Sequence, residues 1–209
     1  MEKYTFGNLE IKVLVIGPIK TNVYILEREN SCVVFDPAFE AEKILSEISL
    51  PLEAIVCTHC HYDHVSAAYN LKKLTGAKSI AFAQDARLIE QGQKSHNVLP
   101  CKVDEVINSD ASISLLGYNW KVLHTPGHTP GSCCWYLPAE ELDNEYGILI
   151  SGDTLFEGTY GRTDFEGGSA KSMKESLAKL AKLPDKTLVF PGHGNHTTIA
   201  KERNRVLFV

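Results

Sequence analysis

Short apolar runs alternate with amphipathic stretches along most of this chain. Runs rich in β-branched or aromatic residues, bounded by turn-forming residues, predict strands. These runs are 9–16, 22–27, 32–36, 54–58, 79–83, 118–125, 133–137, 147–151 and 187–192. Helical spacing of apolar residues predicts helices at 41–48, 65–76, 84–92, 170–183 and 197–206. The interleaving predicts a layered α/β fold, and with no repeat or linker we expect one domain over residues 1–209.

Composition narrows the class of protein. The chain has 209 residues, of which 44% are hydrophobic, which is enough for a full core without covalent staples. Its N-terminus, "MEKYTFGNLEIKVLVIG", carries early charges and lacks the apolar segment of a signal peptide. No apolar run approaches the length of a membrane span. We therefore expect a cytoplasmic protein that does not bind membranes and whose six cysteines are free thiols.

The net charge of −5 excludes a global basic field, so we expect no nucleic-acid partner. A few local basic residues can still bind an anionic small molecule. The sequence leaves the oligomeric state open.

The stretch "CTHCHYDH" at 57–64 is compatible with two kinds of site. Cys57 and Cys60 have the C-x-x-C spacing of redox dithiols and zinc knuckles. The H-x-H-x-D-H run instead has the density of ligands that a two-metal hydrolytic site needs; it comprises His59, His61, Asp63 and His64.

Other metal-competent side chains also follow predicted strands. His128 lies in "HTPGHTPGS", Asp153 in "SGDTLF" and His193 in "PGHG". In layered α/β folds, sites gather beyond the carboxyl ends of strands. Each of these residues alone has an ordinary structural explanation, such as a turn or a packed histidine. Together, five imidazoles and two carboxylates suit zinc, iron or manganese, and a carboxylate could bridge two ions.

These four segments, in this order, resemble the metallo-β-lactamase superfamily over essentially the whole chain. The resemblance implies an αββα sandwich with the site at one edge of the two sheets. It implies two divalent metal ions, with zinc as the first choice. One would be held by His59, His61 and His128, and the other by Asp63, His64 and His193. Asp153 would bridge them, so Asp63 and Asp153 are the candidate catalytic carboxylates.

Differences in sequence separate the branches of the superfamily. The lactamases proper tend to have Cys or another residue at the position of Asp153. The flavodiiron branch has Glu where this chain has His61, and the RNA-processing branch carries a large inserted domain. "LFEGTYGRTDFEGGS" at 155–169 and "PGHGNHTTIAKE" at 191–202 resemble the glyoxalase II, or hydroxyacylglutathione hydrolase, branch.

That resemblance implies hydrolysis of a small-molecule thioester by a metal-bridging hydroxide. Longer members carry a C-terminal helical region that supplies groups for glutathione, and this sequence shows none after "TTIAKE". We therefore expect shared chemistry and leave the thiol carrier open. Arg162 is the candidate substrate-facing cation, with an ion pair to Asp164 as the equal alternative. Tyr160 and Asn195 are further candidates for substrate binding.

Two alternatives to a thioester hydrolase remain. Persulfide dioxygenases, which share "GRTDF", would use one iron held by His59, His128 and Asp153. In that family cysteines stand at the positions of Tyr160 and Ser169, which argues against it. The other alternative is a non-catalytic zinc or redox module built on Cys57 and Cys60. No second spaced cysteine pair completes a zinc site, so we expect Cys57 in the core and Cys60 facing away from the metals.

Overall fold

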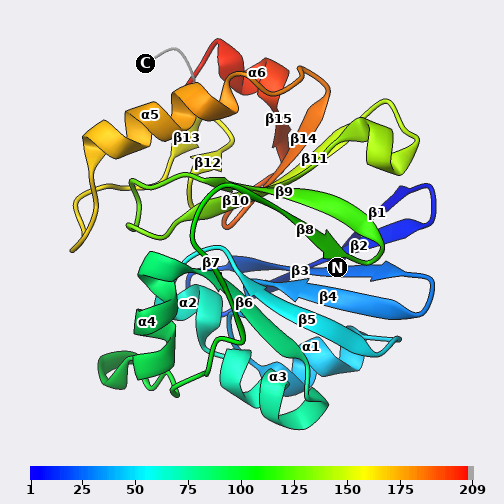
Figure 1. Ribbon diagram of the computed structural model, residues 1–209, viewed down its shortest axis with the longest axis vertical. Coiled ribbons are helices and arrows are strands. Elements are labelled where there is room, and N and C mark those ends of the chain that lie inside the picture. The colour runs from blue at the N-terminus through cyan, green and yellow to red at the C-terminus, as the bar shows by residue number, and fades with distance from the viewer. Residues whose placement is uncertain (207–209) are drawn as a thin grey trace.

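The computed structural model describes residues 1–206 and has two β-sheets packed face to face with helices on both outer sides (Figure 1). The first sheet has seven strands in sequence order: β1 (Glu2–Phe6), β2 (Leu9–Ile16), β3 (Thr21–Arg28), β4 (Ser31–Phe35), β5 (Leu52–Cys57), β6 (Lys78–Phe82) and β7 (Glu105–Ile107). The second has six in the order β15 (Thr197–Thr198), β14 (Thr187–Pro191), β11 (Gly147–Gly152), β10 (Cys133–Leu137), β9 (Tyr118–His124) and β8 (Ala111–Leu115). This arrangement confirms the predicted αββα sandwich.

Helices cover the outer face of each sheet (Figure 1). Those beside the first sheet are α1 (Ala41–Glu47), α2 (Tyr62–Val65), α3 (Ala68–Thr75) and α4 (Ala83–Gln91). Those beside the second are α5 (Ala170–Leu180) and α6 (Ile199–Arg203). Two short 3₁₀ turns, Lys94–His96 and Ala139–Leu142, and the hairpin of β12 (Leu155–Phe156) and β13 (Thr159–Tyr160) complete the described elements. None of the helices within residues 1–206 has the length and apolarity that crossing a bilayer requires.

A large apolar cluster fills the space between the sheets. Phe35 of the first sheet meets Trp120 and Trp135 of the second, with ring centroids 5.7 and 5.6 Å apart. Smaller clusters fix α1, α3 and α4 against one sheet and α5 and α6 against the other. The aromatic contacts hold the two sheets in a fixed relation, and the site spans their common edge.

Each strand predicted from the sequence lies at its expected place, within two residues at either end. The predicted helix at 65–76 is wrong at its start. A separate turn, α2, begins at Tyr62, and Ala67 donates its N–H to Pro37 O at 3.0 Å, which interrupts the helix before Ala68. Gly76 ends α3 in the left-handed conformation, as predicted. The last helix is shorter than 197–206, with Thr198 as its N-cap. Residues 207–209 of the predicted domain lie outside the described part of the chain.

Parallel pairing brings the relevant strand ends to one edge of the molecule. β4, β5 and β6 run parallel in the first sheet, and β11 runs parallel to β14 in the second. The two sheets meet there, because Thr21 and His193 form an isolated bridge and Asn22 donates its N–H to Gly192 O at 2.8 Å. Loops following strands of both sheets therefore converge on one place.

Candidate metal centre

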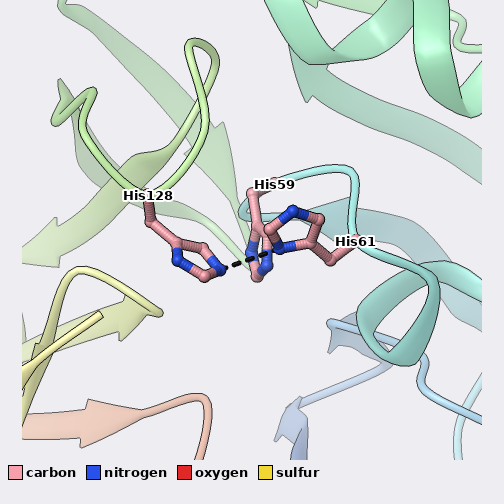
Figure 2. A group of neighbouring side chains, drawn as sticks. All are labelled: His59, His61 and His128. Carbon is pink, nitrogen blue, oxygen red and sulfur yellow. Dashed lines mark hydrogen bonds between the residues drawn. The ribbon is translucent and has the colours of Figure 1, made fainter. Parts of the chain in front are cut away.

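Three histidines from two loops form the first cluster (Figure 2). His59 and His61 follow β5, and His128 lies in the loop between β9 and β10. His61 Nδ1 lies 2.8 Å from His128 Nε2, and each ring places a nitrogen within 4.8 Å of the others. The three rings turn toward a common point, as metal ligands would.

The second cluster combines one carboxylate and two imidazoles. Asp63 Oδ2 lies 3.2 Å from His64 Nε2 and 3.2 Å from His193 Nε2. Asp63 and His64 lie on α2, whereas His193 follows β14. Adjacent residues can both contribute here because the chain turns into a helix immediately after His61.

Asp153, which follows β11, lies between the two clusters. Its Oδ1 is 3.4 Å from His64 Nε2, and its Oδ2 is 3.3 Å from His128 Nε2 and 3.6 Å from His193 Nε2. The carboxylate therefore faces ligand atoms of both clusters. All seven residues predicted as metal ligands lie together at the sheet edge.

Glycines allow the loops to approach this closely. A Cβ atom on Gly192 would lie 2.1 Å from Asp153 Oδ1 and 2.7 Å from His64 Cε1. A Cβ on Gly161 would lie 1.8 Å from the backbone oxygen of Asp153. Any larger residue at either position must displace Asp153.

Two buried polar atoms test whether a metal fits. His59 Nε2 and Asp153 Oδ1 are buried yet have no hydrogen-bond partner within residues 1–206. A buried polar atom without a partner costs about 1–3 kcal/mol, so an atom of this kind normally pairs with a bound ion or water. The donor set is imidazole nitrogen and carboxylate oxygen, which suits zinc, iron and manganese. The residues therefore fit a pair of divalent cations.

Comparison with known proteins agrees with this arrangement. The metallo-β-lactamase superfamily model matches residues 16–193. The chain belongs to the metallo-β-lactamase superfamily. The hydroxyacylglutathione hydrolase GloC of Haemophilus influenzae is 31% identical over 208 residues, covering 93% of this chain and 95% of that protein.

Two solved structures have the same sandwich. TTHA1623 in a di-iron-bound form is 32% identical with a TM-score of 0.80, covering 95% of this chain and 100% of that one. The BLEG-1 B3 metallo-β-lactamase is 30% identical with a TM-score of 0.81, covering 93% of this chain and 96% of that one. Relatives named for different activities thus share the fold, so the family alone does not fix the substrate.

Hydrogen bonds set the orientation of several rings in this superfamily site. His64 Nδ1 donates to Asp36 Oδ2 at 2.9 Å, and His128 Nδ1 donates to Arg162 O at 2.8 Å. A ring that donates from Nδ1 presents the lone pair of Nε2 to a metal when it is neutral. His59 Nδ1 likewise contacts Thr58 Oγ1 at 3.1 Å, which leaves its Nε2 for the cluster.

Asp36 is a functional candidate that the sequence analysis missed. Its carboxylate accepts from Thr58 N and Thr58 Oγ1, both at 2.7 Å, as well as from His64. These bonds occupy its oxygens, so it orients ligands rather than acting as one. Its place at the end of the predicted strand 32–36 was an available signal. Thr21, which donates to Asp63 Oδ2 at 3.0 Å, gave no signal in the sequence.

The pKa values of His59 and His61 are lowered, whereas that of His64 in the second cluster is raised. Burial, followed by the neighbouring imidazoles, lowers the pKa of His59 well below its ordinary value. Burial and His128 lower the pKa of His61 to about 4. Burial alone would lower the pKa of His64, but the carboxylates of Asp153 and Asp36 outweigh it and raise that pKa. Without a metal, His59 and His61 are thus neutral, whereas His64 retains its proton.

The same balance holds for the other two members of the second cluster. Burial disfavours the charged form of Asp63, but hydrogen bonds from His193 and His64 outweigh it and lower its pKa. Burial opposes the charged form of His193, but the hydrogen bond to Asp63 and the charge of Asp153 raise its pKa. Without a bound cation, His64 and His193 therefore retain protons beside the Asp63 carboxylate.

The three candidate substrate residues lie in different surroundings. The Arg162 side chain forms a bidentate ion pair with Asp164, with both bonds at 2.7 Å, and its guanidinium carbon lies 3.9 Å above the Phe165 ring. Tyr160 is 40% exposed at the end of β13. Asn195 donates to Glu157 Oε2 at 3.0 Å and lines a separate hollow with Tyr4 and His196. Arg162 thus forms the ion pair with Asp164 that the sequence offered as the alternative. Its backbone also contacts His128 of the first cluster.

The cysteines occupy positions away from the ligand atoms. All six are free and buried, and Cys57 and Cys60 pack in the apolar cluster beside α3 and α4. Burial, reinforced by Asp85, raises the pKa of the Cys60 thiol. A protonated, buried thiol is a poor metal ligand and a poor nucleophile. Neither cysteine belongs to a metal-competent group among the described residues.

Proposed function

We propose that this protein is a binuclear metallohydrolase that cleaves a small-molecule thioester of the hydroxyacylglutathione type. The observation that carries the proposal is the position of Asp153, whose two oxygens face ligand atoms of both clusters. One ion would be held by His59, His61 and His128, and the other by Asp63, His64 and His193. Zinc is our first choice, with iron and manganese accepting the same ligands.

When bound, two such cations would polarise a carbonyl oxygen and would lower the pKa of a bound water molecule to near neutrality. The chain itself supplies the geometry. Asp36 and the Arg162 carbonyl orient His64 and His128, and Thr21 fixes Asp63. Asp63 stays ionised because its histidine partners lower its pKa, so its carboxylate is available for a cation. Asp153 fixes the position of one cluster relative to the other, because its carboxylate lies between them.

The rim offers a place for the rest of the substrate. Arg162 has a guanidinium that can pair with a substrate carboxylate. Phe165 lies beneath that guanidinium, with its centroid 5.6 Å from the His61 ring, so an acyl group at the metals would contact the same surface. Tyr160 is a further candidate for a hydrogen bond to the substrate, whereas Asn195 lines the separate hollow. For binding, the substrate must displace Asp164 from Arg162.

One relative and the second ligand cluster support a thioester hydrolase over the dioxygenase. A relative named hydroxyacylglutathione hydrolase is 31% identical and aligns with 93% of this chain and 95% of its own length. The alternative, an iron persulfide dioxygenase, would use only His59, His128 and Asp153, and would leave the convergence of Asp63, His64 and His193 without a purpose. We further propose a cytoplasmic protein without nucleic-acid or membrane partners, as its net charge of −5 and its six free cysteines indicate.

The test is a substrate panel on protein purified without added metal, with metal content measured on the same sample. We expect S-lactoylglutathione hydrolysis with two metal ions per chain, and loss of both in Asp153→Ala. Oxygen uptake with glutathione persulfide at one iron per chain would instead establish the dioxygenase. Hydrolysis of a β-lactam in preference to the thioester would also contradict the proposal.

A further inference from the structure

Asp85, on the first turn of α4, connects the two loops that carry the three-histidine cluster. It is 1% exposed and lies on none of the strand ends that carry the ligands. Its Oδ2 accepts from Cys60 N at 2.8 Å and from Thr129 Oγ1 at 2.6 Å. Its Oδ1 accepts from Gly131 N at 2.7 Å. One carboxylate therefore binds both loops.

The donors are neighbours of the ligands in sequence. Cys60 is the residue between His59 and His61, and Thr129 directly follows His128. The Cys60 peptide is held from its other end as well, because Gln93 donates its side-chain N–H to Cys60 O at 2.6 Å. The backbone of Cys60, whose side chain supplies no ligand, is thus held at both its N–H and its C=O.

A steric observation points to the same contact. A Cβ atom on Gly131 would lie 2.5 Å from Asp85 N and 2.5 Å from Asp85 Oδ1. The loop after His128 therefore approaches Asp85 as closely as a glycine permits. The same two loops are also joined by Cys133 N and Thr58 O at 2.9 Å. Removing the Asp85 contacts should loosen the loops without separating them.

We propose that Asp85 is a positioning residue that sets the spacing of His59 and His61 relative to His128 and so determines metal affinity at that cluster. The inference rests on the proposed metal binding by the three histidines. Within residues 1–206, the hydrogen bonds of the Asp85 carboxylate reach no residue of the Asp63, His64 and His193 cluster. Its loss should therefore weaken one metal site and leave the other unchanged.

The experiment titrates metal-free protein with zinc against a chromophoric chelator. Asp85→Asn retains the shape of the side chain but cannot accept from all three donors. We expect about tenfold or greater weakening at one site, with the second site unchanged. His128→Ala and His193→Ala, each lacking one cluster's ligand, identify which site is lost. Asp104→Asn is the control, because Asp104 also accepts a backbone N–H, from Ser79 at 3.0 Å, away from these loops.

A second variant covers the case in which Asp85→Asn does not fold. Thr129→Val removes the hydroxyl donor and should weaken the same site, whereas Thr129→Ser should restore it. Equal weakening of both sites, or two unchanged sites, in the Asp85 and Thr129 variants would overturn the inference while leaving the two-metal proposal intact. Fewer than two sites in the unmodified protein would overturn both.

Discussion

Gly192 controls how closely the last loop approaches Asp153. In Gly192→Ala, the new Cβ would lie 2.1 Å from Asp153 Oδ1, whereas ordinary contact begins at 3.4 Å. The carboxylate must therefore move by about 1 Å or more, and the flexible end of the side chain offers the easiest route. A displacement of about 1 Å at a reacting centre can cost roughly 10²-fold in rate, which corresponds to about 2.7 kcal/mol in the barrier.

The assay compares turnover of S-lactoylglutathione and metal content in Gly192→Ala and in Gly194→Ala. Gly194 has a φ of +74°, and a Cβ added there would meet no atom within 4 Å, so its alanine variant strains the same loop without a clash. We expect about a 10²-fold loss for Gly192→Ala and a much smaller loss for Gly194→Ala. Equal activity in the two variants, with full metal content, would refute the claim that the position of Asp153 limits catalysis.

Three further predictions rest on the same geometry. Cys60→Ser should keep its metal content, because the thiol faces the apolar cluster beside α4; loss of metal by elemental analysis would restore the C-x-x-C hypothesis. Arg162→Ala should raise KM about tenfold with little change in kcat, whereas Lys186→Ala, which removes a remote surface pair with Glu145, should leave steady-state kinetics unchanged. Near pH 7, metal binding should release protons from the second cluster, because carboxylates raise the pKa values of His64 and His193 there. His61 should release none, because its pKa is about 4. Calorimetry in buffers of different ionisation enthalpy checks this, and the absence of proton release when the second cluster binds metal would contradict it.

The strands and the ligands were predictable because both leave a local pattern. Strands such as β10 and β11 are nearly continuous apolar runs, and His128, Asp153 and His193 each lie beside glycines after a strand. The ligands could be recognised from motifs, although their pairing into clusters came from the family resemblance. In the folded structure, the members of each ligand group that the resemblance implied lie close to one another.

Long-range contacts explain what the sequence could not show. Asp36 and Asp85 are single carboxylates in unremarkable strand and helix contexts, and only the fold brings them to Thr58 and Cys60. The interruption between α2 and α3 likewise depends on a backbone bond from Ala67 to the oxygen of Pro37, far earlier in the chain. Edge strands such as β8 and β15 are too short or too polar to stand out by periodicity.

The most direct test of the central claim is to add metal stepwise to the metal-free protein and follow thioester hydrolysis. If Asp153 joins two functional ions, activity with S-lactoylglutathione should rise until two equivalents per chain are bound and then stay constant. Saturation at one equivalent, with full hydrolysis and no further binding, would contradict the binuclear account.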